Sequence, residues 1–126
     1  MDKIVHFEIP ADDFERAKKF YSENFGWQLT SVPEMSYTMV VTGPSGEKGP
    51  TESGFINGGM FKRNNPDITT PLLVINVENI DESIDKIKSS GGVILKDKMN
   101  VGDMGIIAYF KDSEGNVVGL WQALQH

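Results

Sequence analysis

His6 and Glu8 are the two residues of this chain whose types and spacing most clearly suit acid–base chemistry. They lie two positions apart in the segment 4–9, and side chains two positions apart on a strand share one face. An imidazole titrates near neutral pH and can act as a general base. The intervening residues Val5, Phe7 and Ile9 make the opposite face apolar, which suits packing against a helix. Such a strand forms either the wall of a ligand cavity or an ordinary solvent-facing sheet.

Three residues elsewhere in the chain can share that polar face if each strand keeps its alternation. Trp121 offers a flat stacking surface, and Asn76 both donates and accepts hydrogen bonds. The candidate ligand-binding residues are therefore His6, Glu8, Tyr37, Asn76 and Trp121. A second interpretation stays open for single members: His6 as a partly buried histidine with satisfied hydrogen bonds, and Trp121 as core or dimer packing.

The first half of the chain predicts one helix among strands. Asp12 or Asp13 can cap the helix at its start and Gly26 at its end. The helix is predicted over 13–24, because apolar residues recur at three- and four-residue steps at Phe14, Ala17, Phe20 and Tyr21. Strands are predicted over 4–9, 27–32, 37–42 and 55–61.

Glycine and proline mark the irregular parts of this half. Residues 43–54 contain four glycines and two prolines, which predicts a loop, either a binding loop or a flexible connection. The pair Gly58 and Gly59 inside the fourth strand indicates a bulge or a close backbone approach. Residues 62–71 are polar and twice broken by proline, so they are predicted to be a linker.

The second half repeats the plan of the first. Asn79 can cap a helix whose buried stripe is Ile80, Ile84 and Ile87, and residues 90–92 end it. Strands are predicted over 72–78, 93–95, 106–110 and 117–123. Residues 112–116 read as a hairpin turn in which Gly115 and Asn116 suit positive φ.

The order strand–helix–three strands thus occurs twice, with an offset of 66 if Phe14 matches Ile80. This order predicts an α+β fold. Two βαβββ modules, about 1–61 and 72–126, would form a curved eight-stranded mixed sheet with the helices on its convex face. Residues 1–126 would then be a single domain.

Composition excludes several classes of protein. The 126 residues carry a net charge of −6 without a basic patch, which disfavours nucleic acid and anionic membranes. The absence of cysteine excludes disulfides and thiolate sites. No stretch approaches the roughly 20 apolar residues of a membrane span, and no signal peptide is recognisable, so we expect a cytoplasmic protein.

Three segments carry a family resemblance: His6–Pro10 with 17–21 and 25–27, the run 58–60, and 112–121 with the pattern Asp-x-Glu-Gly-Asn-x-x-Gly-Leu-Trp. Together with the repeat they resemble the vicinal oxygen chelate superfamily, which includes glyoxalase I, bleomycin resistance proteins and extradiol dioxygenases. The small glyoxalase-like members are the most similar. The resemblance implies a homodimer and a cavity on the concave face of the sheet.

Enzymes of this superfamily usually hold a divalent metal in that cavity. Carried over, the ligand positions fall at Ile4, Leu72, Gly119 and near 58–60, and none is His, Glu or Asp. We therefore expect no metal and no other cofactor. The alternative uses His6 and Glu8 as displaced ligands, completed by Glu52 or Gln122, because catalytic zinc needs three protein ligands. Gln122 is expected on the face opposite Trp121, and the second histidine, His126, is the last residue.

Three functional hypotheses follow. The first is a metal-free homodimer that binds a small organic molecule in the cavity. The alternative is a metal-dependent lyase or isomerase of the glyoxalase I type with non-standard ligands. The third is a structural or regulatory module that acts through its dimer surface.

Overall fold

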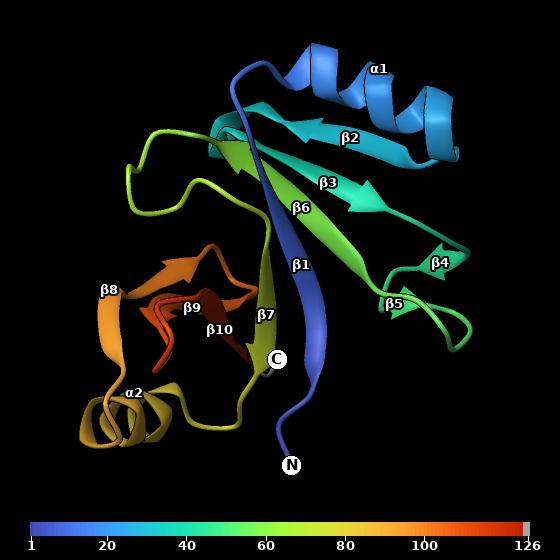
Figure 1. Cartoon of the computed structure of the whole chain (residues 1–126). Coiled ribbons are helices and arrows are strands. Elements are labelled where there is room, and N and C mark those ends of the chain that lie inside the picture. The colour runs from blue at the N-terminus through green and yellow to red at the C-terminus, as the bar shows by residue number, and fades with distance from the viewer. Residues whose placement is uncertain (125–126) are drawn as a thin grey trace. The chain divides into compact units, whose positions relative to one another are not determined.

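The computed structural model describes residues 1–124 and contains two compact units (Figure 1). The N-terminal unit comprises His6–Pro71. The C-terminal unit comprises Met1–Val5 and the chain from Leu72 onward. Neither helix in residues 1–124 is long and apolar enough to cross a membrane.

The N-terminal unit is one βαβββ module with a short extra hairpin. Its elements are β1 (Ile4–Ala11), α1 (Phe14–Phe25), β2 (Gln28–Val32), the 3-10 turn η1 (Pro33–Met35), β3 (Tyr37–Val41), β4 (Ser45–Gly46), β5 (Gly49–Pro50) and β6 (Asn57–Lys62). The hydrogen-bonded order of the long strands is β2-β3-β6-β1, with β1 and β6 parallel and the other neighbours antiparallel. The small β4–β5 pair lies inside the stretch that the sequence predicts as a loop.

The C-terminal unit repeats this module. Its elements are β7 (Leu72–Asn76), α2 (Ile80–Ser89), β8 (Val93–Val101), β9 (Gly105–Lys111) and β10 (Val117–Ala123). The strand order is β7-β10-β9-β8, and the first and last strands of the module, β7 and β10, are again parallel. The predicted α+β class, with two helices and eight long strands in mixed pairing, is confirmed.

Helix α1 begins one residue later than predicted, at Phe14. Asp13 rather than Asp12 is the N-cap, and its carboxylate accepts a hydrogen bond from the backbone N–H of Arg16 at 3.0 Å. Gly26 ends the helix with φ of 72°, the left-handed conformation that favours glycine. Although α1 packs against a core formed by Ala11, Val40 and Met60, none of its own residues is fully buried.

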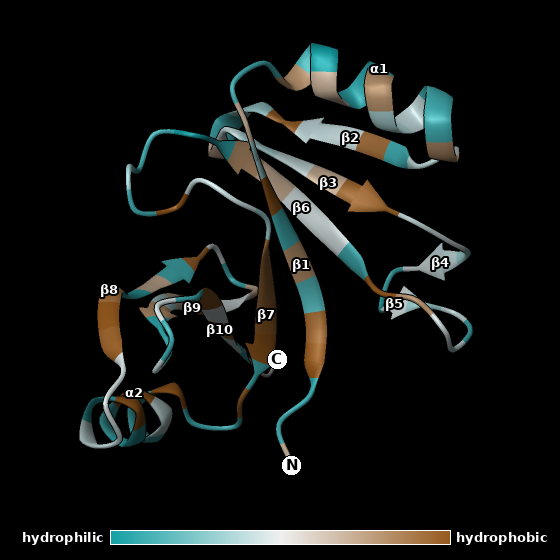
Figure 2. Cartoon of the chain, in the orientation of Figure 1, coloured by the Kyte–Doolittle hydropathy of each residue, from teal (hydrophilic) through white to brown (hydrophobic). Residues whose placement is uncertain are grey.

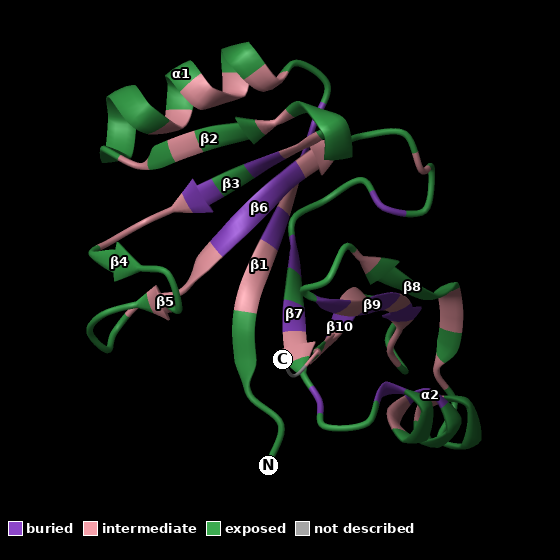
Figure 3. Ribbon diagram, turned by 180° about the vertical axis from the view of Figure 1, so that it is seen from behind, coloured by how far each residue is buried: buried purple, intermediate pink, exposed green. Residues whose placement is uncertain are grey.

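Helix α2 is anchored more deeply. The side chain of Asn79 accepts a hydrogen bond from the backbone N–H of Glu82 at 3.1 Å, as the predicted N-cap requires. Ile80 and Ile84 are buried in the core of this unit, which also includes Ala108, Phe110 and Leu120. Figure 3 shows the contrast, with buried segments on α2 and none on α1.

Strand β8 is much longer than the predicted 93–95. Its second half is polar and exposed, and its pairing with β9 shifts register between Ile94 and Lys96 and again between Lys96 and Met99. Irregular, polar strands are typical of sheet edges, where they oppose unwanted pairing. Hydrophobic alternation therefore could not reveal this strand.

Two other local features also differ from expectation, the end of β1 and the turn 112–116. Strand β1 continues through Pro10, which pairs in register with Phe61, so proline does not end the strand. In the turn 112–116, Gly115 has φ of 83° but Asn116 does not have positive φ. The backbone N–H and side chain of Asn116 instead donate hydrogen bonds to the carboxylate of Asp112, at 2.9 and 3.1 Å.

Candidate functional site

Three of the candidate residues meet on one face of the N-terminal unit. The imidazole Nε2 of His6 lies 3.1 Å from the hydroxyl of Tyr37, within hydrogen-bond distance. The same hydroxyl is hydrogen-bonded to the carboxylate of Glu8. We call His6, Glu8 and Tyr37 the polar cluster. The sequence predicted each member, although it could not show that they touch.

Gly59 makes the polar cluster possible. On β6 it is in register with Glu8 of β1 and with Met39 of β3, whereas Tyr37 is in register with Phe61, two residues further along. The Tyr37 side chain therefore leans over Gly59 to reach its partners, and a Cβ at Gly59 would overlap the Tyr37 hydroxyl. Sequence reasoning placed a metal-ligand position near 58–60 but did not name Gly59 as a ligand-binding residue. The predicted close backbone approach occurs at Gly58, beside the Phe7 carbonyl, whereas Gly59 is approached by the Tyr37 side chain.

Burial sets the charge states of the cluster. Only 2% of Glu8 is exposed. Burial, followed by the negative charge of Glu8 and the hydrogen bond to it, raises the pKa of Tyr37 well above its usual range. Burial lowers the pKa of His6. At neutral pH the phenol is therefore un-ionised and the imidazole is uncharged.

The Tyr37 hydroxyl can donate its one proton to only one of its two partners. An ionised Glu8 carboxylate is a stronger acceptor than an imidazole nitrogen. With Glu8 ionised, the phenol oxygen would accept a hydrogen bond from Nε2–H of His6. In that tautomer the remaining ring nitrogen, Nδ1, carries a lone pair. The cluster therefore offers a hydrogen-bond acceptor and potential base.

A pocket of about 490 Å³ lies in the same unit, at the ends of β2 and β3. Its lining contains no charged side chain and consists of Gly26, Gln28, Val41, Thr42, Gly43, Pro44, Ser45 and Gly46. Val41 alternates with Val40 along β3 and so shares the face of Tyr37, and Gln28 is its register partner on β2. We call this the loop pocket. Its lining suits an uncharged polar group.

Asn57 connects the loop pocket to the polar cluster. On β6 it is in register with His6 of β1. Its side-chain oxygen accepts a hydrogen bond from the backbone N–H of Thr42 at 2.9 Å, and its side-chain nitrogen donates one to the hydroxyl of Ser45 at 2.8 Å. The start of the glycine-rich loop is thereby tied to the strand beside the cluster.

The other two candidate residues belong to the C-terminal unit. Asn76 on β7 and Trp121 on β10 are register partners, as alternation required for a shared face. The indole ring of Trp121 covers Gly105, where a Cβ would come within 2.5 Å of it. Its neighbour Leu120 points the other way, into the core beneath α2. The described contacts thus assemble two groups, one in each unit.

The residues present do not fit a resident divalent metal. Among residues 1–124, no three His, Asp or Glu side chains are close enough together to hold a metal ion. The side-chain oxygen of Gln122 accepts a hydrogen bond from the backbone N–H of Ile80 at 2.8 Å, which confirms that it faces the helix. Glu52 lies exposed in the glycine-rich loop, and His126 lies outside the described residues.

The register of the two modules refines the ligand positions that the resemblance implied. Glu8 pairs with Gly59 in one module as Val74 pairs with Gly119 in the other. Two residues before each, His6 and Leu72 are therefore equivalent, which makes His6 rather than Ile4 the counterpart of Leu72. The expectation that no carried-over ligand position holds His, Glu or Asp was therefore wrong for the first strand.

Comparison with known proteins gives a consistent family. The family described as "Bleomycin resistance protein-like N-terminal" matches residues 3–43. A glyoxylase-like domain-containing protein of Didymella fabae is 32% identical over 90% of this chain and 88% of its own length. A protein of Vibrio parahaemolyticus named as a lactoylglutathione lyase is 29% identical, over 98% of this chain and 92% of its own length. A protein of Mycobacterium bovis named as a glyoxylase is also 29% identical over 94% of this chain, which spans only 45% of that relative.

Solved structures share the fold. Methylmalonyl-CoA epimerase of Streptomyces coelicolor, in complex with 2-nitronate-propionyl-CoA, superposes with a TM-score of 0.66 and covers 98% of both chains. Its sequence identity of 15% shows similarity of fold alone.

Proposed function

Because the chain belongs to the glyoxylase-like family of the vicinal oxygen chelate superfamily, we propose that it binds a small organic molecule on the sheet face of the polar cluster, without a resident metal. The ligand would contact His6, Glu8 and Tyr37 and extend toward the loop pocket. Asn76 and Trp121, on the C-terminal unit, stay predictions from the sequence alone.

The observation that carries this proposal is the placement of the Tyr37 hydroxyl above Gly59. In an ordinary solvent-facing sheet, no glycine is needed to make room for a tyrosine ring, as Gly59 does for Tyr37. Nor would a carboxylate such as that of Glu8 be only 2% exposed. Burying polar groups costs stability unless their hydrogen bonds are satisfied. A hydrogen-bonded trio on the face away from α1 is therefore expected where it contacts a ligand.

The chemistry of the lining suggests which ligands fit. The lone pair on His6 Nδ1 would accept a hydrogen bond from a hydroxyl, amide or enol of the ligand. The loop pocket adds Gln28 and backbone groups but no charge, so the ligand end that enters it would be uncharged. Its volume of about 490 Å³ lies within the usual range for small-molecule pockets.

A metal-dependent lyase or isomerase is the second candidate. The relative named as a lactoylglutathione lyase, similar over nearly its whole length, favours it. The missing third ligand among residues 1–124 argues against it.

The proposal also includes a homodimer and a cytoplasmic location. Light scattering tests the homodimer and should give twice the chain mass of 14.0 kDa.

A ligand screen by thermal shift tests the proposal. We expect a subset of small polar and aromatic compounds to raise the melting temperature, because a ligand at 100 times its Kd stabilises by about 2.7 kcal/mol. Tyr37→Phe and His6→Gln should weaken each hit. Ser89→Ala removes a hydroxyl near the end of α2, outside both pockets, and should leave binding unchanged. A library that never shifts the wild type, or one in which no hit is sensitive to either cluster variant, would contradict the proposal.

Elemental analysis of untagged protein, purified without chelator, separates the two candidates. Metal-free protein that still binds its hits supports the binding function. Near-stoichiometric zinc, nickel, iron or manganese that is lost in His6→Gln would instead favour the metal-dependent enzyme.

A further inference from the structure

A second pocket of about 320 Å³ lies in the N-terminal unit, between α1 and the end of β1. We call it the helix groove. Its lining residues are Ile9, Pro10, Ala11, Asp12, Asp13, Arg16, Ala17, Phe20, Tyr21 and Arg63. None of them belongs to the polar cluster or to the loop pocket, so the groove is a separate feature.

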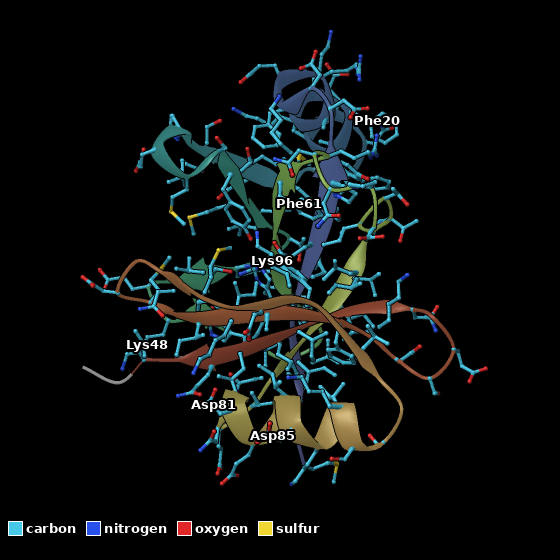
Figure 4. The ribbon with its side chains drawn as sticks, turned by 90° about the vertical axis from the view of Figure 1, so that its left-hand side faces the viewer. Phe20, Lys48, Phe61, Asp81, Asp85 and Lys96 are labelled. Carbon is cyan, nitrogen blue, oxygen red and sulfur yellow. The ribbon has the colours of Figure 1, made fainter. Side chains whose placement is uncertain are left out.

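One flank of α1 forms the wall of the groove. Asp13, Arg16, Ala17 and Phe20 recur at three- and four-residue steps and therefore lie along one stripe of the helix. Phe20 remains 57% exposed even though its ring meets Tyr21 edge to face at 5.3 Å. Figure 4 labels Phe20 on this helix. The groove therefore presents an aromatic ring one helical turn from a guanidinium.

The charged side chains that line the groove differ in whether they are paired with other residues. The carboxylate of Asp12 pairs with the guanidinium of Arg63 at 2.7 Å. The carboxylate of Asp13 caps the helix by accepting from the backbone N–H of Arg16. The guanidinium of Arg16 makes no hydrogen bond or salt bridge with any residue within 1–124, although its charge helps to lower the pKa of the nearby Asp13 carboxyl group. Its five N–H donors are therefore free to bind an anion.

The rest of the lining favours an aromatic body on that anion. Ile9, Ala11 and Ala17 supply an apolar floor, and Phe20 supplies an exposed ring face or edge. Guanidinium groups bind carboxylates and sulfonates through paired hydrogen bonds. The volume of about 320 Å³ is at the small end for ligand pockets, which suits one or two fused rings.

We propose that the helix groove is a second ligand site, which binds a small aromatic carboxylate or sulfonate. The acid group contacts Arg16, with Arg63 beside it. The ring lies against Ala17 and Phe20. This site is independent of the polar cluster, so the two stand or fall separately.

Titration of ¹⁵N-labelled protein with 2-naphthoate, followed by amide shifts, tests the site directly. We expect saturable shifts concentrated at residues 11–21 and at Arg63. The neutral analogue 2-naphthylmethanol has the same ring system without the charge and should bind about tenfold more weakly, because a charge-assisted hydrogen bond is lost. Shifts confined to residues 26–46, or equal affinity for both probes, would overturn the proposal.

A matched pair of variants on α1 sharpens the test. Arg16→Ala should weaken 2-naphthoate about tenfold and leave 2-naphthylmethanol nearly unchanged. Lys19→Ala removes an exposed cation of the same helix that does not line the groove, and it should bind 2-naphthoate as the wild type does. Equal loss in both variants would reduce the effect to general electrostatics and reject the site. Phe20→Ala should weaken both probes.

Discussion

The two modules of this chain share the same strand pairing but carry different kinds of side chain at equivalent positions. In the N-terminal unit, Glu8 is in register with Gly59; in the C-terminal unit, Val74 is in register with Gly119. Tyr37 in the first module corresponds to Ile107 in the second, because each is the register partner of the residue two positions after the glycine of its module. The polar positions of one module are thus apolar in the other.

The space above each glycine shows the difference. Above Gly59 lies the Tyr37 hydroxyl. A Cβ at Gly119 would instead meet side-chain carbon atoms, with Val74 at 3.1 Å and Leu72 and the ring of Tyr109 both at 3.5 Å. Figure 2 shows the same contrast along the first strands, since β1 alternates in hydropathy whereas β7 is apolar along most of its length. The face that carries the polar cluster in the N-terminal unit is thus apolar at the equivalent positions of the C-terminal unit.

The helices extend the comparison, and here the largest effect is expected. Ile80→Ala on α2 should destabilise by about 3 kcal/mol, because the residue is 1% exposed and its truncation leaves a cavity. Phe20→Ala on α1 should cost less than about 1 kcal/mol, since a half-exposed ring buries little area. Urea unfolding of both variants measures the difference. Similar losses would show that α1 is as firmly anchored as α2.

The two glycines give the next test. Gly59→Ala should cost about 2 kcal/mol, because the added methyl displaces the Tyr37 ring from its partners. Gly119→Ala meets only contacts of 3.1 Å or longer and should cost about half as much. Chemical denaturation gives both values, and a ¹³C or ¹⁵N spectrum of His6 should change only in Gly59→Ala. An unchanged His6 signal there would refute the packing described for the cluster.

Removal of a single hydroxyl should have a smaller effect. Tyr37→Phe should destabilise by about 1.5 kcal/mol, because Glu8 and His6 each lose a hydrogen-bond partner. The control Tyr21→Phe, in the aromatic stack with Trp27, should stay within about 0.5 kcal/mol of the wild type. Thermal melts at fixed pH compare them. A neutral Tyr37→Phe would mean that the trio contributes nothing to stability.

The smallest predicted effect is a dependence of stability on pH that arises from His6. Burial lowers the pKa of His6 below its ordinary 6.5, so the unfolded chain takes up the proton first as the pH falls. The free energy of unfolding should therefore decrease below pH 6.5, by at most about 1.4 kcal/mol per unit. Urea titrations at pH 7.5, 6.5 and 5.5 measure it. His6→Leu introduces the residue found at the equivalent position 72, and its unfolding free energy should depend less on pH. An identical pH dependence in the wild type and this variant would contradict the role given to His6.

Sequence patterns were sufficient where local physics decides the outcome. The caps Asn79 and Gly26 and the repeated element order were predicted because caps and apolar periodicity are written in neighbouring residues. Strand β8 was underestimated because its polar, bulged half obeys edge constraints rather than burial. The expectation of positive φ at Asn116 was wrong. Its side chain donates a hydrogen bond to Asp112, and its backbone does not have positive φ.

The sequence by itself determined the α+β class, the duplicated module and the candidates His6, Glu8 and Tyr37. Strand alternation makes the facing of each residue a local property. Only the tertiary structure decided that Tyr37 reaches across Gly59 to join His6 with Glu8, and that Arg16 and Phe20 border a groove. Those contacts depend on register between strands and on helix packing, which bring together residues up to 51 positions apart in the chain, as for Asp12 and Arg63.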